Sequence, residues 1–169
     1  MTMIKPLKGI ELSHVPGIPA AVMPEDSKDM LEFIDANPKA LGFANHQVRV
    51  DHVRYFVVVK DTKFPARVIL NPSYSSYGEN VPARMIDAEA FKNVDEEVPN
   101  LTKAVEGCMS FPWRKTIEVP RFHVINAKFD WFSEDGVMNR FDGVLNGREA
   151  WVFQHETDHC DGITIYFRK

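Results

Sequence analysis

The spacing of apolar residues along the chain predicts two principal helices. In residues 24–37 apolar side chains recur at helical spacing, acidic residues crowd the first turn, and an Asn-Pro pair follows. Residues 146–162 carry the strongest helical pattern, with apolar side chains around His155 and His159 and Gly162 as a terminator. We therefore expect a short helix early in the chain and a longer one late in it.

Other stretches have the composition of β-strands. Residues 53–60 and 66–72 are rich in β-branched residues, and we expect the second strand to close at its Asn-Pro pair. Residues 116–131 alternate enough to give two strands, one on each side of Pro120. Residues 40–47 are expected to form a turn ahead of the first strand.

The least regular pattern lies in residues 73–105, where residues 87–97 have room for a helical turn or two. A turn is expected at residues 134–136, and no linker or internal repeat divides the chain. The mixture predicts an α+β protein with several mostly antiparallel strands, and we expect residues 1–169 to form a single domain.

Composition and charge narrow the classes of function. The chain is 44% hydrophobic with a formal net charge of −4, and its basic residues are scattered, so we expect neither a nucleic-acid partner nor a membrane partner. No stretch approaches the roughly 20 apolar residues that a bilayer span needs. Two cysteines make no disulfide framework and are better interpreted as core residues or metal ligands. The default expectation is a cytoplasmic protein.

The pair His155 and His159 is the strongest indication of chemistry. Residues four apart lie one turn apart on the same helix face, so both imidazoles can point at a single cation. Glu156 lies about 100° further around the helix, where it can act on a water molecule as a general base without being a ligand. Such a pattern also arises by chance on exposed helices, but the apolar flank here indicates a buried one, where polar groups need partners.

A catalytic metal site needs a third protein ligand and an open position. The candidates are Cys108, Cys160 and the carboxylates. Cys160 directly follows His159 and points to another side of the helix, which favours a role in core packing. Cys108 lies 47 residues before His155, beside a glycine that permits close backbone approach. Glu106 and Arg121 are a candidate ion pair that would brace the cysteine strand.

Three motifs resemble the signatures of the peptide deformylase family. "EGCMSFP" (106–112) resembles the second signature and "QHETDHCDG" (154–162) the third, and these two are highly specific. "ALGFANHQ" (40–47) is similar to a degraded first signature, and the order of the three is right. The resemblance spans most of residues 25–167.

The resemblance implies the roles of individual residues. Cys108, His155 and His159 would be the metal ligands, with ferrous iron the usual ion and zinc, nickel or cobalt as substitutes. Glu156 would be the general base and acid, and the Gln47 side chain and the Met109 backbone N–H would face the formyl oxygen. Further roles concern the substrate: the Gly42 backbone would lie close to it, and Leu41, Trp151 and Val152 are candidate walls of a methionine slot or, equally, plain core residues.

The same resemblance implies an α+β fold in which mixed, mostly antiparallel sheets pack around the metal-binding helix. It also implies a reaction, the removal of the formyl group from N-formylmethionine at the start of new polypeptides, with release of formate. The chain stops ten residues after His159. This resembles shortened deformylases of some bacteriophages, which lack a C-terminal helix and any ribosome contact made through it. Residues 73–105 are expected to carry an insertion.

The first motif departs from the family pattern, which suggests a second interpretation, a metal hydrolase with another substrate. Ala40, Phe43, Asn45 and His46 replace usual residues. Ala40 removes the freedom of a glycine to adopt a positive φ. Phe43 and Asn45 are expected to change the volume and polarity beside the metal, and Asn45 and His46 to offer hydrogen bonds to a substrate. The chain would then hydrolyse another acylated amine or a peptide. The third interpretation is a purely structural metal site, although such a site closes with four protein ligands and has no need of Glu156. Asp158 is expected either to orient a ligand histidine or to be a solvated helix residue.

Overall fold

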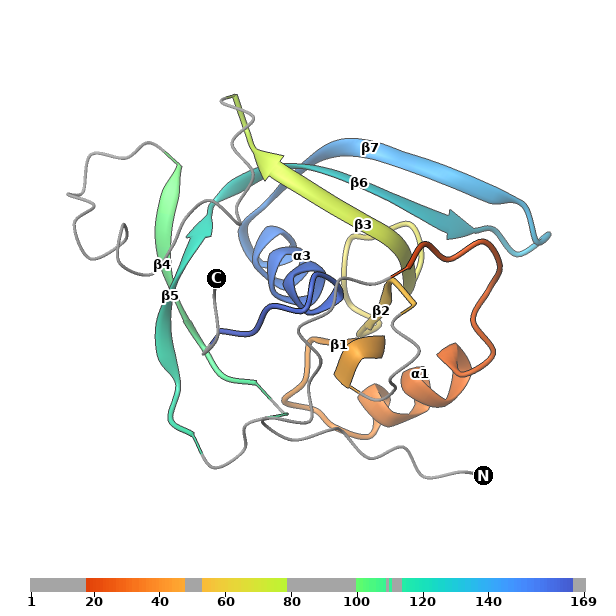
Figure 1. The fold of residues 1–169 in the computed structure, drawn as a ribbon, viewed down its shortest axis with the longest axis horizontal. Coiled ribbons are helices and arrows are strands. Elements are labelled where there is room, and N and C mark those ends of the chain that lie inside the picture. Colours follow the sequence, from red (N-terminus) through yellow and green to blue (C-terminus); the bar gives the residue numbers. More distant parts are fainter. Residues whose placement is uncertain (1–17, 48–52, 79–99, 109, 111–113, 166–169) are drawn as a thin grey trace.

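Helix α3 (Gly147–Cys160) lies between two sheets, with the strands of the larger sheet on one side and a two-stranded ribbon on the other (Figure 1). The computed structural model describes residues 18–47, 53–78, 100–108, 110 and 114–165. Within these residues five strands form the larger sheet in the order β1-β2-β3-β6-β7, and β4 and β5 form the ribbon. Each of these strand pairings is antiparallel, and one isolated parallel bridge joins Ile18 to Val53. The expected α+β architecture around a central helix is therefore confirmed.

The elements follow one another along the chain with these bounds. They are α1 (Ser27–Asp35), β1 (Gly42–Ala44), the 3-10 turn η2 (Asn45–Gln47), β2 (Tyr55–Val58), β3 (Val68–Ser76), β4 (Leu101–Glu106), β5 (Ile117–Phe122), β6 (Val124–Phe132), β7 (Met138–Asn146) and α3.

Helix α3 is held in place by its apolar face. Phe153 is fully buried and meets the ring of Phe56 edge to face, and it packs beside Phe129 and Tyr74 from neighbouring strands. Burial of a large apolar side chain contributes about 1.5–3 kcal/mol, so this cluster fixes the helix against the larger sheet. Cys160 is completely buried in the same core, as expected of a packing residue.

The end of α3 is marked by Gly162, whose φ of 75° lies in the left-handed region that favours glycine. Helix α1, predicted within residues 24–37, buries Met30 and Ile34 against β2. The turn expected at residues 134–136 separates β6 from β7. No helix among the described residues is long and apolar enough to cross a membrane.

Two strand ends lie elsewhere than expected. Strand β3 does not close at Asn71-Pro72 but continues to Ser76, because a register shift between Leu70 and Ser73 absorbs the proline. Asn71 has a positive φ of 51° there, and its amide bonds to Ala20 and to Asp130.

Pro120 lies inside β5, and the break between β5 and β6 falls at His123 instead. A proline fits here because β5 pairs with β4 alone, so its missing N–H faces no second strand. Residues 40–47, expected as a turn, form β1 and η2. The helical turns expected in 87–97 lie outside the described residues, and the following segment contains β4.

Candidate metal centre

Three side chains from distant parts of the chain converge on one point. On α3 the Nε2 atoms of His155 and His159 lie 3.2 Å apart, and Cys108 Sγ lies 3.6 Å from His159 Nε2. The three ligand atoms all lie within 4.8 Å of one another. Cys108 follows β4 by two residues instead of lying in the strand, and its side chain is partly exposed. A thiolate and two imidazoles in this arrangement fit a divalent metal ion, with access for a water molecule.

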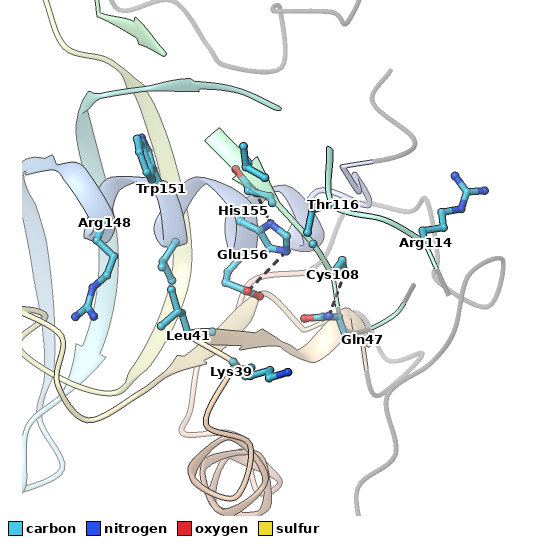
Figure 2. Close-up of a pocket in the computed structure, with 16 residues that line it drawn as sticks. Lys39, Leu41, Gln47, Cys108, Arg114, Thr116, Arg148, Trp151, His155 and Glu156 are labelled. Atoms are coloured by element: carbon cyan, nitrogen blue, oxygen red, sulfur yellow. Dashed lines mark hydrogen bonds and ion pairs between the residues drawn. The ribbon is translucent and has the colours of Figure 1, made fainter. Parts of the chain in front are cut away.

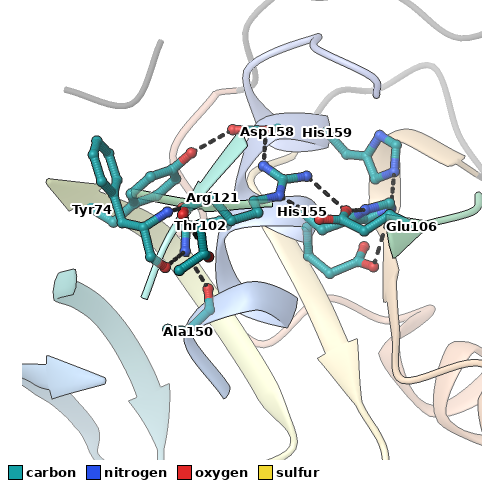
Figure 3. A network of polar contacts seen from close by, with 11 residues as sticks. Tyr74, Thr102, Glu106, Arg121, Ala150, His155, Asp158 and His159 are labelled. Carbon is teal, nitrogen blue, oxygen red and sulfur yellow. Dashed lines mark hydrogen bonds and ion pairs between the residues drawn. The ribbon is translucent and has the colours of Figure 1, made fainter. Parts of the chain in front are cut away.

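The ring of His155 is oriented by a carboxylate from the other sheet. Its Nδ1 lies 2.6 Å from Glu106 Oε1 at the end of β4, which leaves Nε2 facing His159. Arg121 on β5 donates two hydrogen bonds to the same carboxylate, from Nε at 2.6 Å and from Nη2 at 2.9 Å. The Glu106–Arg121 ion pair suggested by the sequence is therefore present, and it reaches the metal centre through His155 (Figure 3).

The network continues from Arg121 away from the metal centre. Arg121 Nη1 donates to Asp158 Oδ2 at 2.7 Å, and the Tyr74 hydroxyl donates to Asp158 Oδ1 at 2.8 Å (Figure 3). Asp158 is buried, so the expectation of a solvated helix residue is wrong, while its orienting of a ligand histidine stays a prediction. Its charge compensates Arg121, whose side chain is only 1% exposed.

The pKa values in this network follow from burial and charge. Burial would raise the pKa of Glu106, but the charge and hydrogen bonds of Arg121 and the bond to His155 hold it far below its usual range. Burial would lower the pKa of His155, yet its bonds to Cys108 and Glu106 raise it well above the usual value. Burial and the charge of His155 hold the pKa of His159 well below its usual value. Since metal ligands must be neutral imidazoles, loading the site releases a proton.

Glu156 points into the same space without a partner for one of its oxygens. Its Oε1 lies 4.0 Å from His155 Nε2, while its buried Oε2 has no hydrogen bond to the described residues. Burial is the main reason that its pKa is raised to about 7. A carboxylate with this pKa exchanges protons near neutral pH, as a general base and acid must.

Gln47 has a fixed orientation toward the centre. Its Oε1 accepts the Ala44 backbone N–H at 2.9 Å, so its Nε2 is directed at Ser110 Oγ, 3.2 Å away, and at Cys108 Sγ, 3.7 Å away. Met109, between those two residues, lies outside the described residues, and its expected role stays a prediction.

A cavity of about 580 Å³ opens beside these groups (Figure 2). Leu41, Gly42, Trp151 and Val152, the four residues expected at the substrate, all line it. Cys108, His155, Glu156 and Gln47 line it as well. The structure therefore brings two of the three expected metal ligands and all four residues expected at the substrate to the wall of one cavity, while His159 lies behind it against His155.

The altered residues of the first motif lie in the core. Phe43 is fully buried, stacks on Phe33 at 4.7 Å and packs with α1. Asn45 and His46 are also buried, and the Asn45 amide donates to the Val53 backbone carbonyl at 3.1 Å. None of the three lines the cavity, so the expectation that Asn45 and His46 offer hydrogen bonds to a substrate there is wrong. His46 nevertheless acts on the ligand His159, because its charge contributes to lowering the pKa of that imidazole.

One buried polar residue was not singled out from the sequence. Gln154 accepts the Phe122 backbone N–H at 2.9 Å and donates to the Phe122 carbonyl at 2.8 Å. This pair of bonds ties α3 to the end of β5, one residue before His155. The sequence feature that could have identified Gln154 is its position on the buried face of the predicted helix, where a side-chain amide needs hydrogen-bond partners.

The comparisons with known proteins agree with this geometry. A sequence model described as polypeptide deformylase matches residues 11–168. The chain belongs to the polypeptide deformylase family. The crystal structure of peptide deformylase from Thermotoga maritima superposes with a TM-score of 0.69 at 25% identity, over 99% of this chain and 98% of that one. The crystal structure of the Thermus thermophilus peptide deformylase gives a TM-score of 0.63 at 28% identity, over 100% of this chain and 86% of that one.

Curated deformylases match over shorter spans. The peptide deformylase of Chromohalobacter salexigens is 32% identical over 136 residues, which are 80% of this chain and 64% of that protein. The enzyme of Thermus thermophilus is 40% identical over 68 residues, 40% of this chain and 33% of its own length. The chain therefore matches between a third and two thirds of the length of these two curated relatives.

Proposed function

We propose that this deformylase-family chain removes the formyl group from N-formylmethionyl peptides and releases formate. The observation that carries the proposal is the convergence of Cys108, His155 and His159 beside the buried Glu156, at the wall of an open cavity. A purely structural metal site would have no use for a buried acid with a raised pKa or for a cavity.

Cys108, His155 and His159 would hold one divalent ion, and we propose ferrous iron, with zinc, nickel or cobalt as substitutes. When bound, such an ion would act as a Lewis acid that polarises the formyl carbonyl, and it would lower the pKa of a bound water molecule to about 7. Glu106 supports this ligand set, because its bond to Nδ1 of His155 keeps Nε2 turned to the ion.

Glu156 would handle the proton of the reaction. Its carboxylate accepts the proton of the attacking water, and the resulting acid then donates that proton to the departing amine. The raised pKa of Glu156, about 7, suits both halves of this exchange. The C–N bond breaks, and the products are formate and a free α-amine.

Gln47 would stabilise the charge that develops on the formyl oxygen. Its Oε1 is engaged by the Ala44 N–H, so Nε2 is the donor that faces the site. We propose the backbone N–H of Met109 as the second donor. A donor of this kind typically contributes about 3 kcal/mol of transition-state stabilisation.

The methionine side chain would enter the apolar end of the cavity, between Leu41, Trp151 and Val152. Full burial of such a side chain is worth about 1.5–3 kcal/mol. Gly42 lets the backbone pass close to Glu156, so that a substrate bound along β1 reaches the proton carrier. Phe43, Asn45 and His46 lie in the core, and Ala40, the fourth altered residue of the first motif, lines the cavity with a methyl group that adds no polar contact for a different acyl group.

We place the reaction in the cytoplasm, where new polypeptides emerge from ribosomes, with residues 1–169 acting as one catalytic domain. Contact with the ribosome would be transient, since the proposal needs only the exposed N-terminus of a nascent chain.

The test is release of formate from a formyl-Met peptide by ferrous protein prepared without oxygen. Turnover with formyl and none with acetyl or unblocked peptides is expected. A rate no higher than that of a Glu156→Gln control would overturn the proposal, and equal cleavage of acetyl peptides would assign the chain to another class of acylated substrate.

A further inference from the structure

The outer part of the cavity differs in chemistry from its inner part. Three cationic side chains line it, Lys39, Arg114 and Arg148, and all three are exposed. They come from three separate segments: the turn before β1, the stretch before β5 and the first turn of α3. These three cations lie around one cavity although the chain as a whole has a formal net charge of −4.

The carboxylates that line the same cavity do not cancel this charge. They are Glu106 and Glu156, and both lie at the inner end beside His155. Glu106 is already compensated by the buried guanidinium of Arg121. Glu156 is only 4% exposed, so its carboxylate lies away from the solvent-exposed outer part of the cavity. Among the residues that line the cavity, the outer part therefore carries cations and no carboxylate, and it is open to solvent.

The contacts of Arg148 keep it at this rim. Its Nη2 donates to the Asp61 backbone carbonyl at 2.9 Å, and its guanidinium lies 3.5 Å from the Asp61 carboxylate and 3.6 Å from that of Glu149. The Asp61 side chain is 75% exposed, so that ion pair is weak and well solvated, but the Glu149 side chain is only 12% exposed. With two carboxylates beside it, Arg148 adds little net charge to the rim. No ion pair of Lys39 is found among the described residues.

The three cations surround the entrance. In Figure 2 Arg148 lies beyond Leu41 and Trp151, Arg114 lies at the opposite end beyond Thr116, and Lys39 lies below Gln47. Because α3 packs against β1 at the inner end, a peptide whose first residue occupies the apolar slot would leave over this rim. Its following residues then pass within the reach of a lysine or arginine side chain.

We infer that the rim selects formyl peptides that carry carboxylates in the residues after the first one. The inference rests on the proposed deformylase activity and adds the class of peptide that is preferred. Each exposed ion pair changes binding by roughly 1.5- to 5-fold, and salt weakens it. A peptide with two aspartates is thus expected to be favoured about 2- to 25-fold over its asparagine analogue at low salt, through KM and not through kcat.

The experiment compares three amidated formyl-Met peptides of equal length that carry two aspartates, two asparagines or two lysines. The specificity constant kcat/KM of the ferrous protein is measured for each at low and at high salt. Affinity for the same peptides is measured by calorimetry on the Glu156→Gln protein, which reports binding apart from chemistry. The order aspartate, asparagine, lysine is expected in both assays, with the differences shrinking at high salt.

The charges are then removed in a Lys39→Gln/Arg114→Gln double variant. We expect the aspartate-to-asparagine ratio to fall toward one there, and to stay at the wild-type value in a Lys128→Gln control, whose lysine is exposed on β6 away from the cavity. Equal constants for the three peptides, or a ratio that the double variant leaves unchanged, would overturn the inference. Absence of turnover on every formyl peptide would instead contradict the proposed function, while calorimetry would still decide the charge preference.

Discussion

Gly42 and Glu156 lie so close that a methyl group on Gly42 would be 2.7 Å from Glu156 Cγ and 3.0 Å from both Cδ and Oε1. The glycine thus holds open the space in which the proposed proton carrier sits. Glu156 is buried on its other sides, so it has little room in which to yield.

Replacing Gly42 by alanine is therefore expected to displace the carboxylate. We predict a loss of at least tenfold in kcat, equivalent to about 1.4 kcal/mol in the activation barrier, with a much smaller change in the free energy of unfolding. Gly143→Ala on β7 is the control, since the atoms nearest to the added methyl group would be those of the Phe141 ring, and Gly143 does not line the cavity. Wild-type kcat in Gly42→Ala would contradict the role given to this contact.

Glu106 supports both the fold and the metal site. In Glu106→Gln one oxygen becomes an amide nitrogen, which cannot accept a hydrogen bond from Arg121 or from His155. Because Arg121 is buried, we predict a fall of about 3–5 kcal/mol in the free energy of unfolding. Misorientation of His155 should also weaken metal binding about 10- to 100-fold.

Urea unfolding and metal titration measure the two effects separately. Glu118→Gln is the matched control, because Glu118 lies exposed on β5. Tight metal binding in a folded Glu106→Gln protein would show that the hydrogen bond to His155 does not matter for the ligand set.

If Gln47 stabilises the developing oxyanion, its replacement should lower kcat and leave peptide binding nearly unchanged. Gln47→Ala removes the donor that its bond from Ala44 directs into the site, so kcat should fall about 10²- to 10³-fold. Peptide affinity in the absence of turnover should change far less, and calorimetry can measure it. A large rise in KM with an unchanged kcat would assign Gln47 to ground-state binding instead.

Glu156 is predicted to lower the stability of the metal-free protein at neutral pH. Its folded pKa of about 7 exceeds the ordinary carboxyl value, so between the two the folded state binds more protons than the unfolded state. The contribution of Glu156 to the free energy of unfolding therefore decreases, by on the order of 3 kcal/mol, as the pH rises through that window. Glu156→Gln abolishes this decrease.

With metal chelated, unfolding free energies at about pH 4.5 and pH 8 test this point. We expect the Glu156→Gln protein to gain stability relative to wild type as pH rises. A constant difference between the two proteins across this range would show that Glu156 titrates normally in the folded chain.

The sequence predicted the site better than the sheet. The helix that carries His155 and His159 follows from one local pattern, and Cys108 follows from a motif resemblance. Strand β7 was missed, because the segment Met138–Asn146 contains Asn, Asp and Gly, and none of its residues is fully buried. Its nine residue pairs with β6 depend on backbone pairing across the hairpin, which leaves no local pattern of hydrophobic residues.

The partners of the site were also hard to predict. That Asp158 compensates Arg121 depends on how β5 meets α3, and that Phe43 lies in the core depends on its packing against α1. These are contacts between residues of different elements, and no spacing rule for a single helix or strand encodes them.

The central claim is that one sulfur and two ring nitrogens bind the same ion. X-ray absorption at the metal edge of the zinc-loaded protein tests it most directly. The account predicts one sulfur at about 2.3 Å and two imidazole nitrogens at about 2.0 Å, with the sulfur lost in Cys108→Ser. A wild-type spectrum that contains no sulfur scatterer would contradict the account.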